Sequence, residues 1–236
     1  MSARLEALLL DAAGTLVRLR EPAADLYRRI AAQHGIARAL PAVARALDAV
    51  RIGPPPLAGV PISEVPVRER EGWRAVVRAA LGDRAADGAC FDAIFDAYAS
   101  PDAWQRVPGV REALRVARTH GLRCAVVSNM DARLPGVLAG LGLGAAFDAL
   151  VLPSTCGLAK PDPGIFAFAL ARLGVRTESA LYVGDRELDC VAAARAAGLH
   201  AWRLDRGAPA EAANVLSGWE DFEPRIEAFA RGCGSG

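Results

Sequence analysis

An apolar run, Leu8 to Leu10, leads directly into Asp11, and a turn that contains Gly14 follows. A buried strand that ends in this way delivers a carboxylate to the carboxyl edge of a sheet, where open α/β folds bind their ligands. A carboxylate held at such an edge can act as a covalent nucleophile. The sequence therefore predicts that Asp11 is a nucleophile, against the alternative that it only caps a turn.

Three later segments also place polar residues after apolar runs. Ser128 and Asn129 follow one such run, Lys160 lies in a proline-rich loop, and Asp185 follows another run with Asp189 four residues further on. Each segment alone is typical of a strand that simply stops at a polar turn. Lys160 is nevertheless the only lysine in a chain that otherwise uses arginine, which favours a dedicated role for it.

The order of nucleophile, hydroxyl, lysine and acidic pair resembles the four motifs of the haloacid dehalogenase superfamily of aspartate-nucleophile hydrolases. The resemblance implies that Thr15 and Ser128 hydrogen-bond to the nucleophile and to the group being transferred. It further implies that Ser128, Asn129 and Lys160 contact the substrate, with the lysine charge paired to Asp11 and to a bound anion.

The same resemblance implies a Mg²⁺ ion held by Asp11, by the backbone carbonyl of Ala13 and by Asp185, with Asp189 just outside the ligands. Mg²⁺ needs few protein oxygens because it keeps several waters. Carboxylates that converge without a cation would also repel one another and raise their own pKa values. Glu187 is the competing candidate for the second acidic position.

Ala13 departs from the pattern, since the superfamily's phosphatases usually carry a second aspartate there to protonate the leaving group. Missing acid–base assistance is expected to lower the rate by roughly 10² to 10⁴. A good leaving group, or a proton donor such as Glu64, Glu69 or Glu71, would compensate. Alternatively, the chain cleaves carbon–halogen or carbon–phosphorus bonds, or it binds phosphorylated ligands without turning them over.

The carbon–phosphorus branch requires a lysine in its helical insertion, and this chain has none there. The dehalogenase branch uses no metal, replaces the residue at Asp185 with a small polar one and carries a tyrosine where this chain has Phe166. Arg38 or Arg45 could still bind the carboxylate of a 2-haloacid. The preferred expectation is a Mg²⁺-dependent hydrolase of a small phosphorylated metabolite, acting through an aspartyl-phosphate at Asp11.

Composition and net charge indicate which class of partner the protein binds and where in the cell it is located. The chain has 236 residues, of which 53% are hydrophobic, and a formal net charge of +1, so no overall field attracts nucleic acid or an anionic membrane. Five cysteines show no paired spacing, and the start of the chain lacks the apolar core of a signal peptide. We expect a cytoplasmic protein with a small-molecule substrate.

The order of elements predicts an α/β fold with a Rossmann-like parallel sheet, helices on both faces and an inserted all-helical cap. Strand and helix patterns alternate from Pro108 to Leu204, which implies right-handed crossovers. Between them and the first strand, the pattern is helical and is interrupted by a proline-rich loop at 53–61. The predicted domains are a core of residues 1–18 and 105–236 and a cap of residues 19–104.

Overall fold

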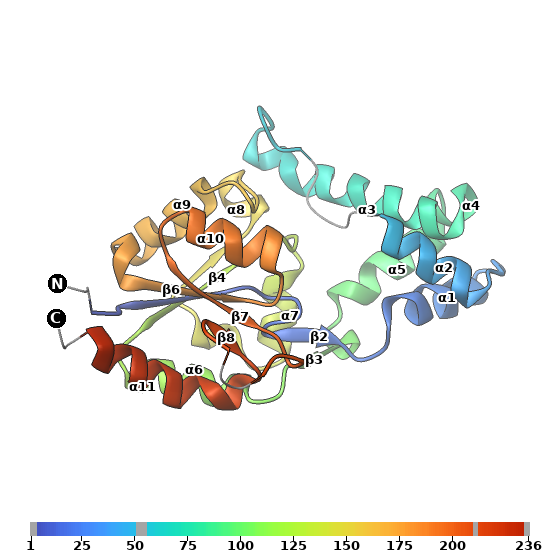
Figure 1. The fold of residues 1–236 in the computed structure, drawn as a ribbon. Helices are drawn as coiled ribbons and strands as arrows, with labels where there is room; N and C mark the ends of the chain where they lie inside the picture. Colours follow the sequence, from blue (N-terminus) through green and yellow to red (C-terminus); the bar gives the residue numbers. More distant parts are fainter. Residues whose placement is uncertain (1–3, 51–55, 210–211, 234–236) are drawn as a thin grey trace.

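The computed structural model describes residues 4–50, 56–209 and 212–233, and a six-stranded parallel sheet lies at its centre (Figure 1). The strand order is β5-β4-β1-β6-β7-β8. All four residues of β1 are fully buried, as expected for a strand covered on both faces. The strands are β1 (Ala7–Leu10), β4 (Arg123–Val127), β5 (Ala149–Val151), β6 (Ala180–Gly184), β7 (His200–Leu204) and β8 (Val215–Leu216).

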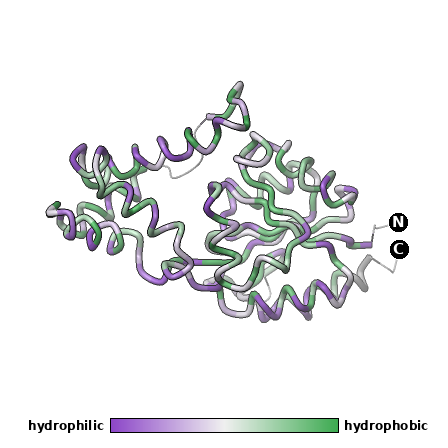
Figure 2. Tube along the Cα trace, turned by 180° about the vertical axis from the view of Figure 1, so that it is seen from behind, coloured by the Kyte–Doolittle hydropathy of each residue, from purple (hydrophilic) through white to green (hydrophobic). Residues whose placement is uncertain are grey.

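Helices cover both faces of this sheet, which confirms the predicted fold class. Leu8 and Leu10 pack in one hydrophobic core, while Ala7 and Leu9 pack in the other, because successive side chains of a strand point to opposite faces. Figure 2 shows hydrophobic strands inside and helices that alternate in hydropathy outside. One face carries α6 (Val110–Thr119), α7 (Leu134–Gly140) and α11 (Phe222–Cys233), and the other carries α9 (Gly164–Leu173) and α10 (Ala192–Ala196).

A helical segment is inserted between two short antiparallel strands, β2 (Val17–Leu19) and β3 (Trp104–Arg106). It lies to one side of the sheet (Figure 1). The predicted domain boundaries at 18/19 and 104/105 fall within this pair of strands, while the division into two domains stays a prediction. The helices are α1 (Ala23–Gln33), α2 (Leu40–Ala49), α3 (Val65–Leu81), α4 (Asp83–Ala86) and α5 (Ala89–Ala99).

Several local details differ from the sequence-based expectation. The helix expected from Leu188 begins as a π-helical turn, Glu187–Val191, before α10. The strand β8, the helix α11 and the short helix α8 (Pro153–Cys156) were not predicted, since each is short or follows the last recognisable motif. In the expected loop at 53–61, residues 56–61 form neither helix nor strand, and 53–55 lie outside the described residues. Within the described ranges no helix could span a membrane.

Candidate active site

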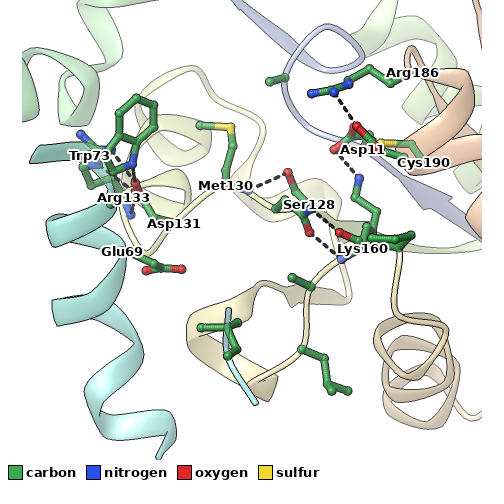
Figure 3. A pocket seen from close by; sticks show the side chains of 18 of the residues that line it. Asp11, Glu69, Trp73, Ser128, Met130, Asp131, Arg133, Lys160, Arg186 and Cys190 are labelled. Atoms are coloured by element: carbon green, nitrogen blue, oxygen red, sulfur yellow. Dashed lines mark hydrogen bonds and ion pairs between the residues drawn. The ribbon is translucent and has the colours of Figure 1, made fainter. Parts of the chain in front are cut away.

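Asp11 and Lys160 form a buried ion pair at the carboxyl edge of the sheet. Asp11 directly follows β1, and Lys160 comes from the loop between α8 and α9. The Lys160 Nζ lies 2.9 Å from Asp11 Oδ1, and the Ala12 backbone amide donates to the same oxygen at 2.7 Å (Figure 3). The two residues are only 6% and 4% exposed. The structure thus brings together the predicted nucleophile and the predicted lysine, and holds the carboxylate with charge-assisted hydrogen bonds.

Two residues that the sequence reasoning missed complete this pair. The Tyr182 hydroxyl, from β6, lies 2.9 Å from Lys160 Nζ. The Cys190 thiol donates to Asp11 Oδ2 at 3.3 Å, and burial together with the nearby charge of Asp11 raises its pKa to about 12, so it remains a thiol. A tyrosine inside an otherwise apolar strand is the one sequence signal that pointed here; nothing comparable marked Cys190.

Ser128 and Asn129 follow β4 and line the same cavity. Ser128 is buried, and its Oγ accepts a hydrogen bond from the Met130 backbone amide at 3.2 Å. The Asn129 side chain pairs with the backbone of Lys160 in both directions, at 2.8 and 2.7 Å. Asn129 therefore fixes the loop that carries the lysine, and its contact with substrate stays a prediction.

Asp185 lies against the turn that follows Asp11. Its Oδ1 is buried and has no hydrogen-bond partner among the described residues. Burial, and then the charge of Asp11, raise its pKa to about 6. A Cβ built on Gly14, whose φ is +82°, would lie 2.0 Å from Asp185 Oδ2, so only glycine allows this approach.

These features fit a divalent cation. An unpartnered carboxylate oxygen and two mutually repelling acids are what a bound Mg²⁺ would satisfy, with the Ala13 carbonyl as a further oxygen donor. Ala13 lines the cavity. The described residues contain no group of three or more His, Cys, Asp or Glu that could hold a metal, and the predicted donor set, with two carboxylates and one carbonyl, stays a prediction.

Asp189 and Glu187 have protein partners at the rim. Asp189 lines the cavity, and its Oδ2 lies 2.5 Å from the Arg186 guanidinium. Glu187 lies 2.5 Å from Arg195 and 4.0 Å from Arg203. Of these two acids, only Asp189 is among the described residues that line the cavity, and its place beside a metal ion stays a prediction.

Thr15 is fully buried beneath the site. Its Oγ1 has no hydrogen-bond partner within the part of the chain that the structure describes, and its backbone carbonyl accepts from Trp219 Nε1 at 2.8 Å. It is absent from the described residues that line the cavity. Its predicted hydrogen bond to the nucleophile stays a prediction.

The cavity has a volume of about 800 Å³ and extends from Asp11 to the helical segment. Its far end carries Glu69 and Trp73 from α3 (Figure 3). Trp73 Nε1 donates to Asp131 Oδ2 at 2.6 Å, and Asp131 is also paired with Arg133. The apolar and aromatic side chains that line the same cavity include those of Leu19, Leu57, Val76, Tyr98, Trp104 and Met130.

Comparison with known proteins identifies the family. Residues 5–198 match the model of the haloacid dehalogenase-like hydrolases. The chain is 33% identical over 221 residues to the haloacid dehalogenase-like hydrolase domain-containing protein 3 of Mus musculus, covering 90% of this chain and 88% of that one. It is 38% identical over 101 residues to the phosphoserine phosphatase of Thermus thermophilus, covering 42% and 41%.

A solved structure shares the fold. The crystal structure of a HAD phosphatase from Thermococcus onnurineus superposes with a TM-score of 0.69 at 20% identity, covering 94% of this chain and 98% of that one. Three observations agree with this family: the parallel sheet, the buried pair of Asp11 and Lys160, and the match along most of the sequence. The chain belongs to the haloacid dehalogenase-like hydrolases.

Proposed function

We propose that the chain is a Mg²⁺-dependent phosphatase that hydrolyses a small phosphorylated metabolite through an aspartyl-phosphate at Asp11. The observation that carries the proposal is the buried Asp11 carboxylate, which lines the cavity, pairs with Lys160 and feels the charge of Asp185, whose Oδ1 has no hydrogen-bond partner among the described residues. The similarity to a phosphoserine phosphatase over part of the chain supports it. The helical segment, residues 19–104, would be the cap that closes over the substrate.

In the first step an Asp11 oxygen attacks phosphorus, and the bond to the leaving oxygen breaks. Lys160 offsets negative charge on both the nucleophile and the phosphoryl group, and the Ser128 hydroxyl can donate to a phosphoryl oxygen. Water then attacks the same phosphorus, which releases phosphate and restores the Asp11 carboxylate. A Mg²⁺ ion held by Asp11, Asp185 and the Ala13 carbonyl, with Asp189 nearby, would neutralise phosphoryl charge.

Because residue 13 is alanine, this position supplies no acid that could protonate the leaving group. Of the three glutamates suggested by the sequence, Glu64 and Glu71 are exposed, and only Glu69 lines the cavity. In Figure 3, Glu69 lies across the cavity from Asp11, beside Asp131 and Trp73. Acyl and aryl phosphates, whose leaving groups depart without protonation, should therefore react fastest, whereas an alkyl phosphate needs its proton from the substrate itself or from solvent.

Dehalogenation receives little support from the site. Arg38 and Arg45 are exposed, and neither is among the described residues that line the cavity. The unpartnered Asp185 oxygen also favours a cation, which dehalogenation does not need. A reducing, cytoplasmic location fits the four described cysteines, which are all free.

A substrate screen tests the proposal. The purified chain is incubated with acyl, aryl and alkyl phosphates and with 2-haloacids, with Mg²⁺ or with excess chelator, and release of phosphate or halide is measured. Phosphate release that requires Mg²⁺ is expected. Halide release in chelator would replace the proposal with dehalogenation, while thermal stabilisation by phosphorylated compounds without turnover would indicate a binding protein.

A further inference from the structure

Glu69 lies in the cavity wall opposite the nucleophile without a hydrogen-bonding partner. It is only 5% exposed, and neither carboxylate oxygen has a hydrogen-bond partner among the described residues. Figure 3 shows its carboxylate projecting from α3 into the cavity. An unsatisfied buried polar group destabilises a fold, and more so when it is charged. Neither oxygen is held by another side chain of the described residues, so the carboxylate has acceptor capacity that a ligand can use.

The surrounding charges leave Glu69 without a cation of its own. Arg133 is the nearby base, but its guanidinium pairs with Asp131 and donates to the Phe95 carbonyl at 2.6 Å. Burial and the charge of Asp131 raise the pKa of Glu69 to about 7, with the Ala132 backbone amide and Arg133 opposing the shift only in part. Additional positive charge near Glu69 would therefore stabilise the ionised form of this carboxylate.

The two ends of the cavity consequently have opposite preferences. Lys160 and Ser128 suit an anion at the sheet end, whereas Glu69 and Asp131 bring two carboxylates and a single guanidinium to the helical end. A ligand that matches both ends carries a phosphate at one end and a positive charge at the other. An ammonium group suits Glu69 better than a hydroxyl, because hydrogen bonds between ionised partners are roughly twice as strong.

We propose that Glu69 is a specificity-determining residue that binds a cationic amine on the carbon part of the substrate, so that the site takes aminoalkyl phosphates. The inference rests on the proposed phosphatase function and deepens it. Apolar side chains that line the cavity, such as Met130, which Figure 3 shows between Ser128 and Asp131, would contact the methylene chain that joins the amine to the phosphate.

The test compares matched substrates and matched variants. Phosphate release is measured from n-alkyl, ω-hydroxyalkyl and ω-aminoalkyl phosphates of two to six carbons, with p-nitrophenyl phosphate as a reference lacking an amine. The variants are Glu69→Gln, Glu69→Asp and the control Glu71→Gln, which changes an exposed glutamate on the same helix that pairs with surface Arg68. Thermal unfolding establishes that each variant is folded.

The best aminoalkyl phosphate should exceed its n-alkyl counterpart in kcat/KM by roughly 10- to 100-fold, the range of a hydrogen bond between charged groups. Glu69→Gln should reduce this ratio to near one through the KM of the aminoalkyl phosphate, while the control Glu71→Gln leaves kcat on p-nitrophenyl phosphate unchanged. Glu69→Asp should retain part of the ratio, and Glu71→Gln all of it.

Two results would overturn the inference while leaving the phosphatase proposal intact. One is an amine preference that is absent, or that survives Glu69→Gln. The other is an equal loss of kcat on all alkyl phosphates in Glu69→Gln, which would make Glu69 a proton donor instead.

Binding separates this inference from the proposed function. If no phosphate ester is hydrolysed, calorimetry with ω-aminoalkyl and n-alkyl phosphonates is decisive. Tighter binding of the aminoalkyl phosphonate, lost in Glu69→Gln, would support amine recognition in a protein that is not a phosphatase. Equal affinities, or no binding of either compound, would overturn the inference.

Discussion

The two ends of the cavity differ in how completely their charges are satisfied. At the sheet end, Asp11 accepts hydrogen bonds from three donors, and Lys160 contacts both Asp11 and Tyr182. At the helical end, neither carboxylate oxygen of Glu69 has a hydrogen-bond partner among the described residues. A preorganised pair suits chemistry that is the same for every substrate, while an unpaired carboxylate suits recognition of a variable group.

The same contrast extends to the elements that hold each end. Asp11, Ser128 and Asp185 each come directly after a strand of one parallel sheet, so the backbone hydrogen bonds of the sheet fix their spacing. Glu69 depends on α3, which contacts the core through Trp73 and Asp131. A displacement of the helical segment would thus move the recognition end relative to the nucleophile.

The largest effect is expected from Asp11→Asn, which should lower kcat by at least about 10³-fold with every phosphate ester. The amide keeps the volume of the carboxylate but cannot attack phosphorus. Steady-state phosphate release, with circular dichroism as a check of folding, measures the effect. A variant that turns over at the parental rate would remove Asp11 from the mechanism.

Lys160→Met comes next, with a loss of roughly 10² to 10³ in kcat, because a preorganised positive charge is removed from the reacting group. It should also destabilise the chain by about 3–5 kcal/mol when no metal is present, since Asp11 would be left buried and uncompensated beside Asp185. Denaturant unfolding in chelator measures this change.

The double variant Asp11→Asn, Lys160→Met serves as the control for that loss of stability. It removes both charges, so it should recover much of the free energy of unfolding that Lys160→Met loses. If the double variant is as unstable as Lys160→Met alone, packing rather than charge accounts for the effect.

The sequence predicted the sheet end far better than the helical end. Asp11, Ser128 and Asp185 directly follow strands whose apolar runs are recognisable in the sequence. Lys160 is noticeable because it is the only lysine in the chain. Tyr182 and Cys190 were missed because their roles depend on which face of a strand or helix meets Asp11. Glu69 could be suggested, yet its burial depends on how α3 packs against the loop that carries Asp131, and helical periodicity does not supply that information.

A smaller change is expected from Ala13→Asp, which would place a carboxylic acid near the leaving group. Ala13 is exposed to the cavity and keeps its carbonyl whatever its side chain. Alkyl phosphates should gain roughly 10- to 100-fold in kcat, below the roughly 10²- to 10⁴-fold ceiling of general acid–base catalysis because the surroundings are not built for the new group. Phosphate release from paired alkyl and aryl esters measures the gain.

The aryl esters are the internal control for Ala13→Asp. Their leaving groups need no proton, so they should gain little. Equal acceleration of both ester classes would contradict a leaving-group role. An unchanged rate with both, in a folded variant, would mean that protonation of the leaving group does not limit turnover.

The smallest expected effect concerns stability and the helical end. Glu69 has a folded-state pKa of about 7 against an ordinary value of 4.5, so between these pH values the folded chain binds more protons than the unfolded chain. The free energy of unfolding therefore falls as the pH rises from about 4.5 to about 7, and Glu69→Gln removes that fall. The free energy of unfolding of Glu69→Gln, measured relative to that of wild type, should therefore be about 1–3 kcal/mol higher at pH 8 than at pH 4.5.

In this comparison Asp185 titrates in both proteins, so its contribution cancels in the difference. Urea unfolding of wild type, Glu69→Gln and the exposed control Glu71→Gln at both pH values measures the effect, and a difference that does not change with pH would show that the carboxylate at the helical end is satisfied after all.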